Sequence, residues 1–517
     1  MIFEINGRPG VSRALSAAAC LVAVAVPARA DLTADQVWDQ WRGYMESFGY
    51  DVTADTSTTG NSLTVDNMTM VMNLPEAEKG GTFRMSWGTM TLTSMPDGSV
   101  DVGLPASFPV VVRVEPTGEP AVDLALTYAT RDFAMKATGT PEDTVYTYSA
   151  GGLGITLDSV MSDGQPMEVT AQADLTGISG VSSLDTAAGF SADQTFDAES
   201  VSYAFAFTSP DPAEPGSMSL TGTATGLNFE GSMAVPEGMD IEDMAAALTA
   251  GYAMAGTFTY QSGQSDMTVD DAGEAFAMSS TTGTGTAKIA MDKDGFVYDV
   301  RGTDAQINVT GDSIPFPVDI AAGEIGLDIA MPLSRSDELQ TFGAGLTLAD
   351  IKLPEMIWGM FDPTGGLPHD PVTVRLDLSG VGRLFVDLTD EAQMSQLGAT
   401  GGLPGEVQSL KLEELLVSGL GARIAATADL DVDNNAMSPL GPFPNVFGVA
   451  NIQLNGVKGL IEKLSGMGLL PPGQAMMASA MISELGKPGS GPDDLSADLE
   501  LTPNGALTVN GKPIPLQ

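Results

Sequence analysis

Residues 110–126 read VVVRVEPTGEPAVDLAL and contain two short runs in which every second side chain is apolar. The alternating residues are Val110, Val112 and Val114 in the first run and Val122, Leu124 and Leu126 in the second. Alternation with a period of two is typical of a β-strand that turns one face to a core and the other to solvent. The stretch therefore predicts two neighbouring strands of an antiparallel sheet.

The same alternation continues on both sides of this stretch, from about Tyr50 to Leu333. Turn signals separate the runs, with an aspartate–glycine pair at 97–98, 163–164 and 294–295. No fixed repeat period is present, so neither a propeller nor a regular solenoid is supported. The pattern predicts a mainly β fold with a few helices, built as a large antiparallel sheet that is curved or two-lobed.

The hydrophobic pattern changes near residue 336, from strand alternation to a mixture of strand and helix spacing. This change divides the chain into a strand-rich domain, 31–335, and a mixed β/α region, 336–517. Helical spacing predicts a first helix over 33–48, and Thr33 and Gln36 form a capping box at its start. Further helices are expected at 240–248, in part of 346–361, at 457–464 and at 474–485. A hairpin of residues 495–501 and 507–509 closes the chain.

The N-terminal thirty residues have the pattern of a secretory signal peptide. Arg8 and Arg13 precede an uncharged run from Ala14 to Val26, and a small-residue cleavage pattern ends at Ala30. Cleavage after Ala30 predicts a periplasmic protein. No later stretch contains about 18 consecutive apolar residues, so we expect no transmembrane segment in the mature chain.

Charge and cysteine content exclude several classes of function. The chain has 22 lysine and arginine residues against 67 aspartate and glutamate residues, a net charge of −45. Such a surface repels nucleic acid, and we expect no nucleic-acid partner. Its one cysteine, Cys20, lies in the predicted signal peptide, so the mature chain has no disulfide and no thiolate metal site.

Few residues indicate a reaction. The single histidine, His369, stands beside Asp370 in a proline- and glycine-rich loop, and the pair is a weak candidate for acid–base catalysis. Asp429, Asp431 and Asp433 have the spacing of a calcium loop, but Asn434 replaces the turn glycine of such a loop. A strand with one aspartate face explains them better. We expect no cofactor.

Methionine is frequent, with 28 residues in the chain. Met68, Met70 and Met72 lie at strand spacing, and Trp38 and Trp41 share one face of the predicted first helix. Thioether side chains fill irregular cores and also line tolerant apolar grooves. These five residues are therefore expected in a core, with an apolar surface for a partner or lipid as the alternative.

Three segments carry a resemblance to a known family. They are the aromatic helix with Trp38, Trp41 and Tyr44, the segment 356–362 (MIWGMFD) leading into 367–378 (LPHDPVTVRLDL), and the ending 504–514 (NGALTVNGKPI). With them the chain resembles the alphaproteobacterial exported proteins grouped as domain of unknown function 2125. The resemblance implies a location in the Gram-negative envelope and carries no catalytic residues.

Taken together, these features favour a non-enzymatic periplasmic envelope protein that binds a lipid-like or other apolar ligand in a β groove. A periplasmic hydrolase that uses acidic residues near His369 is one alternative. A structural or assembly partner of another envelope protein is the other.

Overall fold

A computed structural model describes residues 32–74, 80–187, 189–213, 215–239, 243–438, 441, 443–491 and 493–514. The predicted signal peptide, 1–30, lies outside the described residues, as do residues 240–242 at the start of the predicted helix 240–248.

The described strands form one 27-stranded sheet in which all pairings are antiparallel. The first strands are β1 Asp51–Thr59, β2 Ser62–Asn73, β3 Gly81–Trp87, β4 Met90–Ser94, β5 Val100–Gly103, β6 Ser107–Pro116, β7 Val122–Arg131 and β8 Ala134–Gly139. Long strands follow: β9 Asp143–Ser162, β10 Gln165–Asp185, β11 Phe190–Thr208, β12 Gly216–Val235, β13 Ala253–Tyr260, β14 Ser262–Asp271, β15 Glu274–Thr282, β16 Gly285–Asp292, β17 Gly295–Gly311 and β18 Val318–Met331. The last are β19 Gln340–Ile351, β20 Val372–Leu384, β21 Gly405–Gly419, β22 Ala422–Met437, β23 Pro444–Asn455, β24 Lys487–Pro488, β25 Asp494–Leu501, β26 Leu507–Val509 and β27 Lys512–Ile514. The predicted fold class is confirmed.

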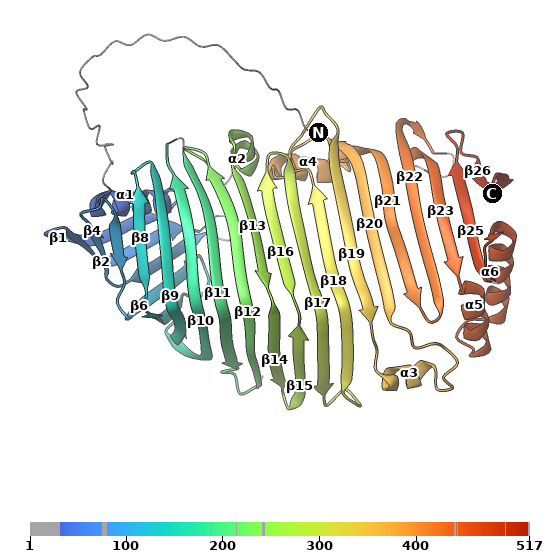
Figure 1. The fold of residues 1–517 in the computed structure, drawn as a ribbon, viewed down its shortest axis with the longest axis horizontal. Coiled ribbons are helices and arrows are strands. Elements are labelled where there is room, and N and C mark those ends of the chain that lie inside the picture. The colour runs from blue at the N-terminus through green and yellow to red at the C-terminus, as the bar shows by residue number, and fades with distance from the viewer. Residues whose placement is uncertain are drawn as a thin grey trace, which may run out of the picture.

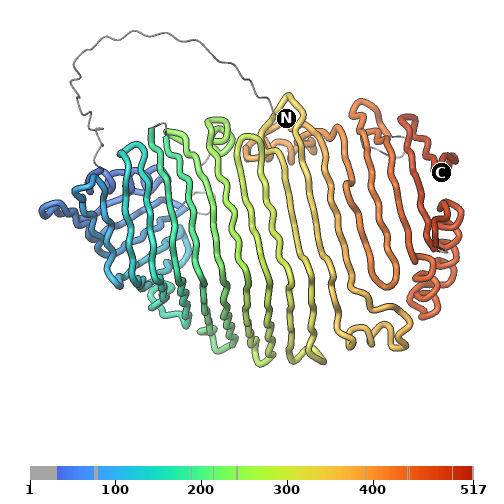
Figure 2. Tube along the Cα trace, viewed as in Figure 1, coloured from blue at the N-terminus to red at the C-terminus, as the bar shows by residue number. Residues whose placement is uncertain are grey.

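The described helices are α1 Ala34–Ser47, α2 Met244–Ala250, α3 Glu355–Phe361, α4 Glu391–Thr400, α5 Val457–Gly466 and α6 Pro472–Leu485. Helix α1 packs on the N-terminal strands, and the other described helices lie at the edges and the C-terminal end of the sheet (Figure 1). Figure 1 shows α1 at the N-terminal end, α2 and α4 along one long edge, α3 along the opposite edge, and α5 and α6 beside the C-terminal strands. Between these ends, the strands from β9 to β23 stand side by side in a single layer (Figure 2).

The first helix begins as its sequence predicts. The Thr33 hydroxyl accepts a hydrogen bond from the Gln36 amide at 3.3 Å, and the Gln36 side chain accepts one from the Thr33 amide at 2.9 Å. These two bonds satisfy amides that the first turn leaves without partners. Val37 and Trp38 are buried on the inner face of α1, in a core with residues of β2, β4 and β5.

The core is concentrated at this N-terminal end. Leu63, Val65, Leu92 and Val100 are at most 2% exposed, and all belong to one cluster beneath α1. By contrast, from residue 253 to residue 351 no buried residue is larger than proline. The long part of the sheet is therefore held mainly by its hydrogen-bonded ladder, with no second layer to bury its side chains.

Long strands keep their apolar residues on one face through local breaks in the alternation. Gly177 in β10 and Gly226 in β12 have φ angles of 59° and 61°, which glycine adopts without steric strain. On either side of Gly177, Leu175 and Ile178 belong to the same apolar cluster although their numbers differ in parity. The left-handed residue therefore shifts the alternation by one and preserves the face.

Around the expected boundary and beyond it, the structure adds detail that the sequence did not show. The segment 346–361 is helical in part, as predicted: β19 continues to Ile351, and α3 begins at Glu355. Helix α4 was not predicted because its residues show no apolar stripe, although Asp390 caps it by accepting a hydrogen bond from the Gln393 amide at 3.0 Å. Strands β18 and β19 pair across the expected boundary near residue 336, so the sheet is continuous there.

A pair of leucine substitutions tests where the stabilising core lies. Leu92→Ala removes a fully buried side chain beneath α1 and is expected to lower the free energy of unfolding by about 2–5 kcal/mol. Leu327→Ala removes a side chain that is 43% exposed and is expected to change it by less than about 1 kcal/mol. Urea titration followed by tryptophan fluorescence measures both; equal losses would contradict an N-terminal core.

Candidate functional site

The two faces of the sheet differ sharply in chemistry. Directly paired residues form an apolar row that crosses the sheet from β9 to β25. The row consists of Tyr148, Gly180, Phe196, Phe229, Phe258, Ala287, Val300, Leu327, Leu346, Leu376, Leu415, Ala426, Ile452 and Ala497. We call the side of the sheet that carries this row the apolar face. Neighbouring side chains in a strand point to opposite faces, so the residues beside the row lie on the other side.

The opposite side is polar. Its matching row consists of Thr195, Glu230, Thr257, Lys288, Asp299, Asp328, Gly345, Asp377 and Glu414. Arg301 lies on the same side and binds Asp299 at 2.9 Å and Asp328 at 3.4 Å. We call this side the polar face. It has the exposed ion pairs of a solvated surface, each of which stabilises the sheet little.

The apolar face is not covered by another layer in the part of the chain that the structure describes. Ile289, Leu327 and Leu346 are 40%, 43% and 36% exposed at the middle of the sheet. Monomeric proteins rarely leave a contiguous apolar surface of this extent in water, and such surfaces commonly mark sites for ligands or partners. The apolar face is therefore the candidate functional surface.

A pocket opens at the N-terminal end of the apolar face. It is lined on one side by residues of β3 and β6 and on the other by residues of the first long strands, β9 to β11. Its volume is about 440 Å³, and no charged side chain lines it. Its principal side chains are Met85, Trp87, Phe108, Tyr128, Ile178 and Phe196. Tyr148 and Phe196 belong both to the pocket and to the apolar row, so the pocket and the face form one continuous surface.

The aromatic and methionine residues singled out in the sequence lie next to this pocket but not on its surface. Trp38, Met68 and Met70 are buried in the N-terminal core, and Trp41 packs against that core beside Tyr146. Met72 is half-buried and pairs with Phe83 of β3. Met68 and Met70 pair with Trp87 and Met85, which reach the pocket in their place. Trp38, Met68 and Met70 thus belong to the core beside the pocket, and Trp41 and Met72 are partly buried.

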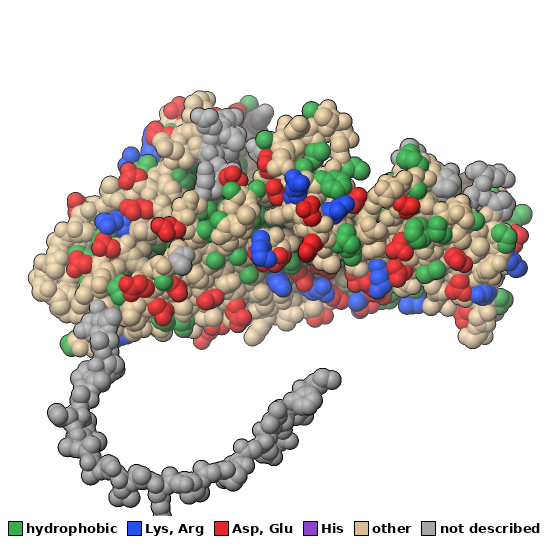
Figure 3. Space-filling model, turned by 90° about the horizontal axis from the view of Figure 1, so that it is seen from above, with side chains coloured by type: hydrophobic (Ala, Val, Ile, Leu, Met, Phe, Trp, Pro, Cys, Tyr) green, Lys and Arg blue, Asp and Glu red, His purple; other side chains and the backbone are tan. Residues whose placement is uncertain are grey.

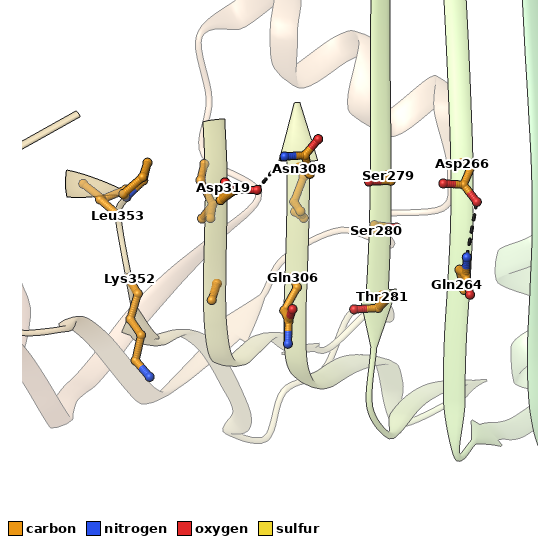
Figure 4. A pocket seen from close by; sticks show the side chains of 14 residues that line it. Gln264, Asp266, Ser279, Ser280, Thr281, Gln306, Asn308, Asp319, Lys352 and Leu353 are labelled. Atoms are coloured by element: carbon orange, nitrogen blue, oxygen red, sulfur yellow. Dashed lines mark hydrogen bonds between the residues drawn. The ribbon is translucent and has the colours of Figure 1, made fainter. Parts of the chain in front are cut away.

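A second hollow, of about 410 Å³, lies on the polar face. Figure 4 shows its lining side chains standing on adjacent strands, with Gln264 bonded to Asp266 and Asn308 bonded to Asp319. Lys352 closes one side. Because the amides and carboxylates are bonded to one another, this hollow has the character of a hydrated sheet surface.

His369 is placed by stacking on an aromatic ring. Its imidazole lies 4.4 Å from the Trp358 ring, nearly parallel to it, and Trp358 is only 4% exposed. The His369 Nδ1 atom is 3.0 Å from a Glu355 carboxylate oxygen, whereas Nε2 is 3.7 Å from Asp362 Oδ2 and has no hydrogen-bond partner. Asp370, the residue expected to assist His369, is exposed. Glu355 and Asp362 are therefore the carboxylates at His369.

Asp362 anchors the loop that carries His369. Its buried carboxylate accepts hydrogen bonds from the Leu367 amide at 2.7 Å and the Gly366 amide at 2.9 Å. The bond from Leu367 is the main reason that the pKa of Asp362 is lowered below its ordinary value of 3.8. With its lone pairs used in this way, Asp362 acts as a structural clamp. The hydrolase hypothesis at His369 stays a prediction.

The three aspartates with calcium-loop spacing lie on β22. Alternate residues of an extended strand are roughly 7 Å apart along the strand, so the three carboxylates do not wrap around one point. Asp429 pairs with Lys411, and Asp433 accepts a hydrogen bond from the Asn435 amide at 2.9 Å. Among the described residues, no group of three or more histidine, cysteine, aspartate or glutamate side chains could hold a metal ion.

Sequence reasoning identified many strands of the apolar face but not the face itself. The alternating runs 201–207 and 254–260 each showed which residues share a side within one strand. Only the pairing of strands shows that Phe229 lies beside both Phe196 and Phe258. The signal was present in each strand, but register between strands is a long-range property.

Comparisons with protein-family models, curated proteins and solved structures found no match for this chain. The family resemblance carried by the three sequence segments therefore stays a prediction. No described helix is long and apolar enough to cross a lipid bilayer. The geometry of the two faces, the pocket and the His369 loop is what indicates function.

The clamp at Asp362 can be tested by hydrogen exchange. Because the folded state lowers the pKa of Asp362, its anchoring is fully present above pH 3.8 and is lost as the pH falls through the lowered pKa. We expect the protection factors of the Gly366 and Leu367 amides, which compare each rate with its intrinsic rate at the same pH, to fall below that pH and also at neutral pH in Asp362→Ala. Asp370→Ala is the matched control and should leave both amides protected.

Proposed function

We propose that this protein is an exported envelope protein that binds an elongated, lipid-like ligand without converting it. The observation that carries the proposal is the unbroken apolar row from Tyr148 to Ala497, which joins a pocket without charged lining. Export is supported by the signal-peptide pattern of residues 1–30.

The pocket favours a ligand with a flexible hydrocarbon part. Ligand sites of a few hundred cubic ångströms that are lined by aromatic and aliphatic side chains bind apolar groups by removing them from water. Phe108 and Tyr128 stack with their ring centroids 5.5 Å apart and form one wall of the pocket. The polar groups in the lining are hydroxyls such as Thr89 and Thr130, which suit a neutral ligand better than an ion.

The apolar face beyond the pocket favours an elongated ligand. A compact ligand would be enclosed by the pocket alone, whereas the apolar row continues across the sheet past Leu346 and Leu415. A long chain can enter the pocket with one end and lie along the row with the rest. Burial of apolar area then stabilises the complex by about 25 cal/mol for each Å² removed from water.

The negative charge of the protein restricts which lipid headgroup the ligand can carry. Figure 3 shows acidic side chains scattered over the molecule in the view from above, with the basic ones fewer. The chain as a whole carries a charge of −45. Anionic headgroups are therefore disfavoured near the protein, and a neutral or zwitterionic ligand is the better match.

Matched substitutions on the two sides of β19 test the proposal. Leu346 lies on the apolar face and Thr347, its neighbour, on the polar face. Leu346→Glu places a carboxylate under the ligand, and we expect about ten-fold less lipid to co-purify, because desolvating an unpaired charge is unfavourable by more than the 1.4 kcal/mol of a ten-fold change. Thr347→Glu should carry as much lipid as the unaltered protein.

Native mass spectrometry and solvent extraction of the purified protein measure the bound lipid. Equal lipid in both variants, or none in the unaltered protein, would contradict the proposal. A mass of two chains that Leu346→Glu reduces to one would show instead that a second copy covers the face, which is the structural-partner alternative.

Filling the pocket is an independent test. Ala150→Trp projects an indole into the cavity from β9, and we expect it to weaken binding of a fluorescent fatty acid by about ten-fold. Thr147→Trp adds the same group to an exposed site on the same strand and serves as the control. Loss of binding in both variants, with circular dichroism unchanged, would point away from the pocket.

A further inference from the structure

The helical hairpin of α5 and α6 exposes large apolar side chains that the fold does not use. Met476, Met477 and Met481 are 75%, 69% and 57% exposed on α6, and Leu469 in the connecting turn is 52% exposed. These four side chains lie within thirteen residues of one another in the sequence. We call them the hairpin patch.

The hairpin patch is exposed because α6 packs against the fold with only one of its two sides. Ala475 is buried against the rest of the hairpin, and Ile482 and Leu485 follow at helical spacing on that inner side. The methionines occupy the outer side, where an ordinary surface helix carries charged residues. The fourteen residues of α6 include only one charged side chain, Glu484. The helix is thus apolar on both sides and buries only one of them.

The hairpin also departs from the charge of the whole chain. Acidic residues outnumber basic ones by 67 to 22 overall. In residues 457–487, by contrast, the charged side chains are Lys458, Glu462, Lys463, Glu484 and Lys487. Lys487 is paired with Asp498 at 2.7 Å, and the hairpin itself is still far less acidic than the rest of the chain.

Position links the hairpin to the apolar face. Figure 1 shows α5 and α6 at the C-terminal end of the sheet, beside its last strands, and α3 along the lower edge. Gly486, at the end of α6, lies against Leu495, which continues the apolar side through its pairing with Leu454. Helix α3 adds Met356 and Met360, which are 52% and 67% exposed.

We infer that the α5–α6 hairpin rests on the surface of a lipid bilayer and inserts its methionine side between zwitterionic headgroups. A surface element that exposes an apolar side binds in the plane of the interface, with a strength that rises with the apolar area it buries there. At 1.5 Å per residue, α6 is about 21 Å long, too short to span the hydrocarbon core. Methionine suits this contact because its flexible thioether adapts to a fluid surface.

This contact is separate from the proposed ligand site. The hairpin patch lies outside the pocket and the apolar row, and it needs no bound ligand to insert. Bilayer contact at the end of an apolar face would let an elongated lipid pass between membrane and protein, which adds a route to the proposed function. Vesicle binding tests the hairpin, and co-purified lipid tests the face, so either idea can fail alone.

Flotation of the full chain with phosphatidylcholine vesicles tests the inference. We expect the unaltered protein to float with the vesicles, and Met476→Glu, Met477→Glu and Met481→Glu combined to reduce the bound fraction about ten-fold. Added phosphatidylglycerol should weaken binding, because the protein is strongly acidic. Leu403→Glu is the control: Leu403 is 72% exposed, follows α4 on the opposite edge, and should float normally.

A labelling experiment shows which residues insert. In a Cys20→Ser chain, Met477→Cys carries the only thiol, and a polarity-sensitive fluorophore on it should shift to the blue when vesicles are added. Leu403→Cys, labelled in the same way, should not shift. An unshifted label at Met477, flotation that the triple substitution leaves unchanged, or stronger binding to phosphatidylglycerol vesicles would each overturn the inference.

Discussion

Strand register is the constraint on which the rest of this structure depends. Side chains alternate along each strand, so a slip of one residue between any two neighbours would turn a whole apolar set to the other face. The pairing of Leu327 with Leu346, and of Leu346 with Leu376, shows how closely the register is kept through the middle of the sheet. Within β10, the left-handed residue Gly177 shifts the alternation by one, so the apolar residues on its two sides stay on the same face of the sheet.

The uneven distribution of burial gives the two ends of the molecule different roles. Beneath α1, residues such as Val37 and Leu92 form a dry core that can fold and hold a fixed shape. Across the long strands the sheet is one layer, and its apolar side chains remain partly in contact with water. Apolar side chains that stay in water contribute little to the free energy of folding. This is the physical basis for proposing that the apolar face binds a ligand.

The acidic residues distinguish the two faces of the sheet. They occupy the polar face and the loops, where Arg301 and Lys411 offset a few of them locally. A high net charge of one sign opposes unspecific association of proteins in general. At His369, Asp362 holds the loop amides and Trp358 supports the ring. The hairpin of α5 and α6 is where acidic residues give way to methionine and lysine.

Local signals in the sequence were enough to predict what depends on neighbouring residues. Alternation in runs such as 201–207 predicted strands, the capping box at Thr33 predicted α1, and helical spacing predicted α5 and α6, because each of these features involves contacts within a few residues. The helix α4 was missed because its ten residues have no apolar stripe. Tertiary structure alone decided that Glu355 and Asp362 rather than Asp370 meet His369, and that the apolar residues of many strands share one face. These outcomes depend on the register and twist of strands far apart in the sequence, and no local pattern encodes which strands will pair.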